Sequence, residues 1–381
     1  MSAHLSTDKW AKPAPDPLPK RRLCIVVPTH WEAFMGGAQY QAKWIVEEAA
    51  RTNLFEIYYL SRRIREGVKP IDHHIVRIGG AKWLRRFGLL FDARSLWKRL
   101  DEIRPEVIYQ RVGGAYTGVC ASYAARRGAR MIWHIAHDDD VTPGAGGGRW
   151  RKPHRLMEKK LLEYGIRKAD AVIAQTRYQA RLLRKNYGID AAAVIPNAHP
   201  YPRERVSKGT PVKVVWVANW KPEKRPELFI KLAEDLSHRT DARFYMAGSL
   251  GSTNQDYSSL VNRAKHLTNL EYLGGISQEQ VNALLAEADV FVNTSRGEGF
   301  ANTFIQAWLR GVPVVSLSVN PDGLLGETGL GFCSGDYRTL RDDVFKLVTD
   351  ESIRTRMGRY CTEYATESHS LRNVRQIIEL M

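Results

Sequence analysis

The sequence predicts an α/β protein made of two domains with parallel β-sheets. Its 381 residues exceed one ordinary α/β core. Residues 22–28 are predicted as an apolar strand followed by a glycine loop and a helix, and the order of strand, loop and helix returns from residue 212. Strands are also predicted at residues 171–174, from residue 193 and at residues 270–274, with a helix at residues 226–236. A further strand, loop, helix and strand follow within residues 286–315. We expect a flexible tail (1–22), an N-terminal domain (23–200), a linker (201–210), a C-terminal domain (211–365) and a terminal helix (366–381) that packs back on the first domain.

The composition is that of a soluble globular protein, with 44% hydrophobic and 26% charged residues. The proline-rich tail lacks the apolar core of a secretory signal, and no apolar run reaches the length of a membrane span. The four cysteines have no paired spacing, which fits a reduced cytoplasm and argues against a short-spaced zinc site.

The positive charge lies entirely in the first half of the chain. Residues 1–200 contain 35 Lys and Arg against 19 Asp and Glu, which accounts for the whole net charge of +16. This asymmetry predicts an anionic partner for the N-terminal domain, either an acceptor or a membrane surface, rather than nucleic acid. Residues 81–91 combine cations with apolar side chains in the pattern of an interfacial anchor, or else pack on the domain core.

The segment of residues 286–315 holds the strongest signal for a ligand site. Asp289–Asn293 and Gly311–Val315 are predicted as buried strands, with a helix over Ala301–Arg310 between them. The loop at the end of the first strand could hold a phosphorylated ligand through backbone amides. Glu298 and Gln306 are eight residues apart, so one polar ligand could contact both.

This segment resembles the E-x7-E region of the family 4 retaining glycosyltransferases. The resemblance implies the GT-B architecture, in which two Rossmann-like parallel-sheet domains face each other across a cleft. It implies that Glu298 contacts the donor sugar and that Gln306, which stands where the family has a second Glu, holds the ribose. The amides expected to hold the donor diphosphate are those of Gly299, Phe300, Ala301, Asn302 and Thr303.

The resemblance extends to the loop after the strand of residues 212–217. Lys224 matches a family lysine that neutralises the diphosphate, while Asn219 stands in the place of the family's arginine. We expect Arg225 or Arg296 to supply the missing charge, or donor binding to be weaker.

Two further matches lie in the N-terminal half. Gly36 and Gly37 correspond to the family's loop beneath the diphosphate, and His137 fits the family's sugar-contacting histidine better than His134 does. The three aspartates of residues 138–140 raise the alternative of a metal, but adjacent carboxylates point in different directions, so we expect none.

The sequence thus predicts a metal-independent retaining hexosyltransferase without a cofactor. It would move a sugar from a nucleotide-diphosphate-sugar to a lipid-linked or soluble glycan, with His137, Glu298 and Lys224 as catalytic residues. The expected setting is polysaccharide or glycolipid assembly in the cytoplasm or on the inner face of the membrane. The alternatives are a catalytically weak GT-B protein that acts as a binding or scaffold partner, because Asn219 and Gln306 replace charged residues, and an epimerase of the same fold.

Overall fold

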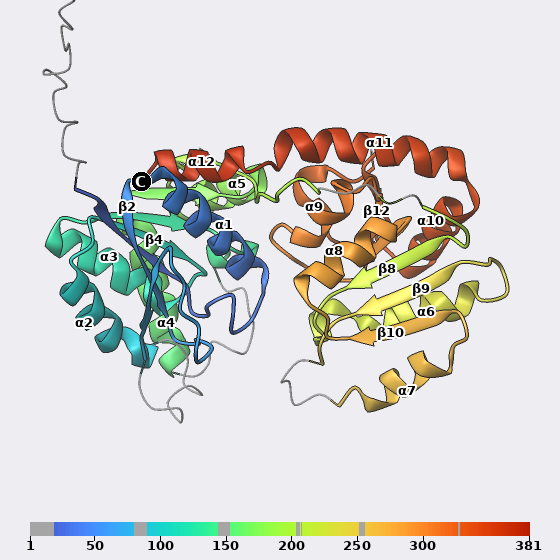
Figure 1. The fold of residues 1–381 in the computed structure, drawn as a ribbon, viewed down its shortest axis with the longest axis horizontal. Helices are drawn as coiled ribbons and strands as arrows, with labels where there is room; N and C mark the ends of the chain where they lie inside the picture. The colour runs from blue at the N-terminus through green and yellow to red at the C-terminus, as the bar shows by residue number, and fades with distance from the viewer. Residues whose placement is uncertain are drawn as a thin grey trace, which may run out of the picture.

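The computed structural model describes residues 19–79, 90–143, 153–202, 206, 208–250, 256–326 and 328–381. It consists of two α/β domains side by side (Figure 1). The predicted membrane anchor at 81–91 lies outside the described residues except for Leu90 and Phe91. Within the described part, no helix is long and apolar enough to cross a membrane.

The N-terminal domain is built on a seven-stranded parallel sheet in the order β3-β2-β1-β4-β5-β6-β7. Leu23 of β1 lies opposite Ile57 of β2 on one side and Val107 of β4 on the other. From β1 the sheet is extended in one direction by β2 and β3 and in the opposite direction by β4 to β7, so the strand order reverses between β1 and β4. The strands are β1 Arg21–Val26, β2 Phe55–Ser61, β3 His74–Arg77, β4 Val107–Arg111, β5 Arg130–His134, β6 Ala171–Ala174 and β7 Ala193–Val194.

Helices cover both faces of this sheet, as its apolar strands require. On one face α1 and α12 pack together, and Ile45 and Ile377 share one apolar cluster. On the other face Leu100, Tyr116 and Leu183 belong to a second cluster. The helices of this domain are α1 Gly37–Thr52, α2 Ala93–Ile103, α3 Ala115–Arg127, α4 Pro153–Lys168, α5 Arg177–Tyr187 and the short η2 Leu90–Asp92 and η3 Asp138–Val141.

The C-terminal domain repeats this plan with a six-stranded parallel sheet in the order β10-β9-β8-β11-β12-β13, which reverses between β8 and β11. Its strands are β8 Lys213–Val217, β9 Arg243–Ala247, β10 Leu270–Gly274, β11 Val290–Asn293, β12 Val314–Ser316 and β13 Gly331–Cys333. Its helices are α6 Pro226–Leu236, α7 Ser258–His266, α8 Gln278–Glu287, α9 Asn302–Trp308, α10 Tyr337–Thr349, α11 Glu351–Ser368 and the short η5 Pro222–Lys224 and η6 Pro321–Gly323.

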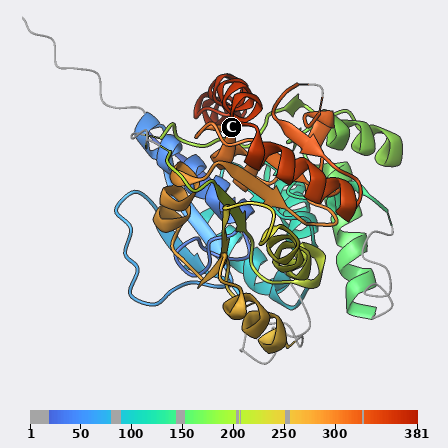
Figure 2. The same cartoon turned by 90° about the vertical axis from the view of Figure 1, so that its right-hand side faces the viewer.

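The C-terminal segment returns to the first domain. The long helix α11 runs from one domain to the other, and α12 (Arg372–Glu379) lies on the N-terminal sheet (Figure 1). Arg375 forms an ion pair with Glu48 of α1 at 3.0 Å, and Arg21 donates a hydrogen bond to the carbonyl of Met381. Figure 2, with the C-terminal domain in front, shows α11 at the edge of both domains.

Three details differ from the sequence prediction. The strand expected at Gly311–Val315 begins at Val314, because Gly311 adopts a left-handed conformation (φ +63°) and the Val312 amide still bonds the carbonyl of Ala307. The strand expected from Ala193 ends after two residues. Helix α7 was not predicted.

Candidate functional site

A cavity of about 410 Å³ lies where the two sheets direct the carboxyl ends of their strands toward each other. Its walls include the loop that follows β1 and the last residue of β4, Arg111, in the first domain, and the loops that follow β8 and β11 in the second. These are the two points at which strand order reverses, and open α/β sheets bind ligands at such points.

The structure brings together almost all of the sequence-predicted site residues at this cavity. Those that line it are Gly36, Gly37, His137, Asn219, Lys224, Glu298, Gly299, Phe300, Ala301, Asn302, Thr303 and Gln306.

Arg225 is the exception: the prediction that it belongs to the site is wrong. The Arg225 side chain donates to the carbonyls of Thr294 (2.7 Å) and Ser295 (3.2 Å) and to the Ser318 hydroxyl, so it supports the loop after β11 and is not among the lining residues. Arg296, the other suggested substitute for the family's arginine, is exposed and does not line the cavity either.

Sequence reasoning missed several polar residues of the cavity wall, among them Arg111, Gln175, Asn197 and Lys221. Arg111 and Gln175 stand at or just after the ends of β4 and β6. That position is a usable signal, because strand ends meet at one edge of a parallel sheet. Lys221 precedes Lys224 in the same loop and supplies a cation near Asn219.

Glu298 and Lys224 form an ion pair, with Lys224 Nζ 2.8 Å from Glu298 Oε1. The same oxygen accepts hydrogen bonds from the Ser295 hydroxyl (2.8 Å) and from Asn293 Nδ2 (3.2 Å). Within the described residues no hydrogen bond is made to Oε2, so this second oxygen is available to a hydroxyl group of a ligand.

Burial raises the pKa of the Glu298 carboxyl, but the Lys224 cation and the hydrogen bonds from Lys224, Ser295 and Asn293 outweigh burial, and the pKa lies below its ordinary 4.5. Glu298 is therefore an anion at neutral pH.

Gln306 is buried at the cavity wall, on the same helix that follows Glu298. Its Nε2 donates to Asn282 Oδ1 at 2.9 Å. This bond holds the amide in place and leaves the side-chain oxygen of Gln306 as a hydrogen-bond acceptor for a hydroxyl group.

The two histidines of the predicted His-Asp loop have different surroundings. His134 is fully buried, whereas the His137 side chain is 44% exposed and lines the cavity. His137 Nδ1 accepts a hydrogen bond from the amide of Asp139. Asp138 binds the Gln179 amide, while Asp140 accepts from the backbone of residues 136 and 137. Among the described residues, no group of three His, Cys, Asp or Glu side chains is arranged to hold a metal ion.

The two domains are in contact at the N-terminus of α9. Asn302 Nδ2 donates to the Gly37 carbonyl (3.0 Å), and Gln41 Nε2 donates to Asn302 Oδ1 (3.2 Å). At Gly299 a Cβ atom would stand only 3.0 Å from the Ala136 carbonyl. The glycine therefore permits the loop after β11 to approach the first domain this closely.

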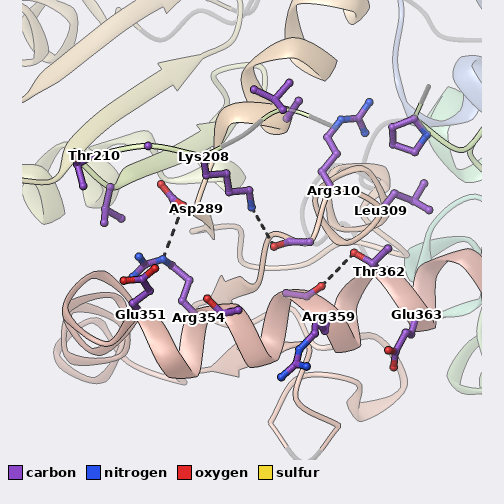
Figure 3. Close-up of a pocket in the computed structure, with 18 of the residues that line it drawn as sticks. Lys208, Thr210, Asp289, Leu309, Arg310, Glu351, Arg354, Arg359, Thr362 and Glu363 are labelled. Atoms are coloured by element: carbon purple, nitrogen blue, oxygen red, sulfur yellow. Dashed lines mark hydrogen bonds and ion pairs between the residues drawn. The ribbon is translucent and has the colours of Figure 1, made fainter. Parts of the chain in front are cut away.

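A second cavity, of about 780 Å³, lies beneath the interdomain connection against α11 (Figure 3). Its polar groups bind one another: Arg354 pairs with Asp289 at 3.8 Å, and Lys208 donates to the Gly311 carbonyl. None of the sequence-predicted site residues lines it, so the smaller cavity is the candidate site.

Comparison with known families covers both domains. Residues 35–199 match the model "Glycosyltransferase Family 4", and residues 211–350 match "Glycosyl transferases group 1". The chain belongs to glycosyltransferase family 4. Both matched regions contribute residues to the candidate site.

Individual relatives are more distant. The chain is 36% identical over 84 residues to the lipopolysaccharide core biosynthesis glycosyltransferase LpsE of Rhizobium meliloti, which is 21% of this chain and 25% of LpsE. It is 28% identical over 236 residues to the D-inositol 3-phosphate glycosyltransferase of Corynebacterium efficiens, which is 55% of each chain. The chain thus spans from 19% to 55% of the length of the curated relatives it matches.

Solved structures agree over nearly the whole chain. Sucrose-phosphate synthase from Thermosynechococcus elongatus superposes with a TM-score of 0.77 at 13% identity, over 95% of this chain and 98% of the other. HepE from Anabaena, in complex with UDP and glucose, gives 0.73 at 15% identity, over 94% and 98%. At these identities the likeness establishes the fold, which is GT-B.

Proposed function

We propose that this family 4 chain transfers a sugar from a nucleotide-diphosphate-sugar to a glycan acceptor. The supporting observation is the single cavity onto which both strand-order reversals open, with the Lys224–Glu298 ion pair in its wall. A phosphorylated donor needs cations on one side of a cleft, and Lys221 and Lys224 provide them from the second domain.

The proposed reaction retains the anomeric configuration and uses no metal or other cofactor. The bond between the anomeric carbon and the diphosphate oxygen breaks, the acceptor oxygen bonds that carbon, and the hydroxyl proton passes to the departing phosphate. Lys224 opposes the negative charge that develops on the leaving diphosphate. Glu298, with Oε2 available, orients the donor sugar, and His137 contacts it from the facing wall.

The test is release of nucleoside diphosphate from a panel of nucleotide-sugars, with and without mixed glycan acceptors. Lys224→Ala should weaken nucleoside diphosphate binding by roughly 10- to 100-fold, the scale of a lost charge-assisted hydrogen bond. Lys231→Ala is the matched control, because Lys231 pairs with Asp235 on an exposed face of α6. Unchanged affinity in Lys224→Ala would remove that residue from the site.

The neutral residues Asn219 and Gln306 favour a second candidate, a catalytically weak protein that binds the nucleotide without transfer. Tight binding by the wild type with no diphosphate release from any nucleotide-sugar would support it. Interconversion of two sugar epimers would instead indicate an epimerase.

We also propose that the acceptor is lipid-linked or a soluble glycan and that the basic N-terminal domain works at the cytoplasmic face of a membrane. The support is the location of the whole +16 charge in residues 1–200. Sedimentation with anionic and neutral liposomes tests this. Binding to anionic vesicles only, weakened by salt and by Arg85→Glu with Arg86→Glu, is expected; indifference to lipid charge would favour a soluble acceptor.

A further inference from the structure

The N-terminal wall of the cavity contains a buried arginine that has no acidic partner. Arg111 is the last residue of β4, lines the cavity and is 1% exposed. Its guanidinium donates to Asn197 Oδ1 (2.7 Å), to His134 Nδ1 (3.2 Å) and, at 3.5 Å, to the Tyr109 hydroxyl. Among the described residues no carboxylate lies within ion-pair distance of it. Its Nε has no hydrogen-bond partner there either.

The partners of Arg111 are all neutral. A guanidinium can only donate, so His134 Nδ1 must be the acceptor and must lack a proton. Burial and the Arg111 charge hold the pKa of His134 well below its ordinary value, and burial raises the pKa of Tyr109. The charge of Arg111 is therefore uncompensated within its own surroundings.

Another buried arginine of the same domain shows the usual arrangement. Arg62 is 8% exposed and forms an ion pair with the buried Asp92 at 3.2 Å. A charge removed from water is costly unless an opposite charge and hydrogen bonds replace the solvent. An arginine kept at a cavity wall without such a partner indicates that the counter-charge arrives with a ligand.

The backbone holds Arg111 in place. Gln110 Nε2 donates to the carbonyls of both Arg111 and Val112. Val112 has φ +77°, which is strained for a β-branched residue. The turn after β4 is thus fixed at the position where the side chain of Arg111 meets the cavity.

The positions of the cations on the two cavity walls indicate which ligand Arg111 binds. On the facing wall, Lys221 and Lys224 already provide two cations for the donor diphosphate. Arg111 stands on the N-terminal wall, and the same wall includes Gln175, whose side-chain oxygen is buried and has no hydrogen-bond partner among the described residues. A cation and an unused acceptor suit a ligand with an oxyanion and a hydroxyl group.

We propose that Arg111 forms an anion subsite on the N-terminal wall that binds a phosphate or carboxylate group of the acceptor. The acceptor is then an acidic sugar or a sugar phosphate. The assignment of the bound anion to the acceptor rests on the proposed function, while the anion subsite itself follows from Arg111 and its neutral neighbours.

The test is titration of the full-length protein with inorganic phosphate and with acetate, in the absence and in the presence of a saturating nucleoside diphosphate. Phosphate or acetate should still bind when the diphosphate is present. Arg111→Met should weaken that binding by roughly 10- to 100-fold, and Arg111→Lys by less. Lys224→Ala should weaken the diphosphate and leave the second anion unaffected. The anion that binds more tightly identifies the acidic group.

A measurement on the wild type guards against misfolding of the variants. One imidazole nitrogen of His134 accepts a hydrogen bond from Arg111. The ¹⁵N resonances of this imidazole should therefore shift when phosphate is added. The His134→Gln variant, which lacks these resonances, assigns them. Loss of phosphate binding once the diphosphate is present, or equal binding in wild type and folded Arg111→Met, would overturn the subsite. A wild type that binds phosphate through Arg111 but no nucleoside diphosphate would contradict the proposed function instead.

Discussion

At the scale of single residues, Glu298 connects three polar side chains at the cavity. Its Oε1 binds Lys224, Ser295 and Asn293, while Oε2 is proposed to bind the sugar. We expect Glu298→Gln to lower turnover by about 100-fold with little change in nucleoside diphosphate affinity, because the lost interaction involves the transferred sugar. Steady-state kinetics alongside Glu287→Gln, an exposed control that pairs with Lys213, tests this. Turnover at the wild-type rate would contradict the assignment.

The lowered pKa of Glu298 also predicts a pH dependence of stability. A carboxyl whose pKa is lower in the folded protein stabilises it above the ordinary pKa of 4.5, and this contribution is lost as pH falls through the folded value. The difference in melting temperature between wild type and Glu298→Gln should therefore be constant near neutrality and shrink below pH 4.5. A difference that grows on acidification would show that Glu298 is not held as an anion.

The sequence motifs predicted many of the residues that line the cavity, but not the contacts among them. Glu298 and Lys224 were expected on the sugar and on the diphosphate, and the fold places them in contact with each other. Arg225 stood next to Lys224 in sequence, yet its backbone is left-handed (φ +49°) and its side chain binds the loop after β11. The role proposed for Arg111 depends on its neutral neighbours His134 and Asn197, which are distant in sequence, so no local pattern records it.

At the scale of secondary structure, helices α3 and α4 pack closely through glycines. A Cβ at Gly165 would lie 2.6 Å from the Thr117 backbone, and one at Gly118 would lie 2.4 Å from the Leu161 carbonyl. Gly165→Ala should destabilise the protein by about 1–3 kcal/mol through this backbone clash, despite the higher helix propensity of alanine. Denaturant unfolding beside Gly209→Ala, where nothing lies within 4 Å of the new atom, measures the effect. A stabilised Gly165→Ala variant would mean that the helices can separate at little cost.

Most strands and helices could be predicted because apolar runs and helical periodicity are local signals. β6 (Ala171–Ala174), β10 (Leu270–Gly274) and α6 (Pro226–Leu236) occur at the predicted residues. Helix α7 was not predicted because it has only nine residues and its apolar face is limited to Leu260, Val261 and Ala264, of which Ala264 alone is fully buried. The start of β12 was misplaced because Gly311, Val312 and Pro313 are apolar or small yet form a turn.

At the scale of the whole molecule, buried histidines hold the C-terminal segment to the first domain. His369 follows α11, and its Nδ1 donates to the Asn197 carbonyl at 2.8 Å. Burial lowers the pKa of His369 to about 4 and that of His199, whose amide bonds the His369 carbonyl, to about 3. Below pH 6.5 the unfolded chain takes up protons that the folded chain does not, so acidification toward pH 4 should destabilise the fold.

His369→Gln should reduce this loss, by up to about 1.4 kcal/mol for each pH unit between 6.5 and 4. Chemical denaturation over this range measures the slope, and His266→Gln serves as the control because His266 is exposed. An identical slope in wild type and His369→Gln would show that His369 is already charged in the folded protein.

Two α/β domains and their order could be predicted from length and from the repeated strand, loop and helix. The closeness of the domains could not, because it depends on single contacts such as Asn302 with Gly37 and Asp322 with the amides of Arg177 and Tyr178. These contacts join residues more than 140 positions apart.

A crystal structure with a bound nucleoside diphosphate should show the diphosphate in the 410 Å³ cavity, with a phosphate oxygen within about 3 Å of Lys224 Nζ. A nucleotide bound instead in the cavity beneath the interdomain connection, against Arg354, would contradict the proposed donor site.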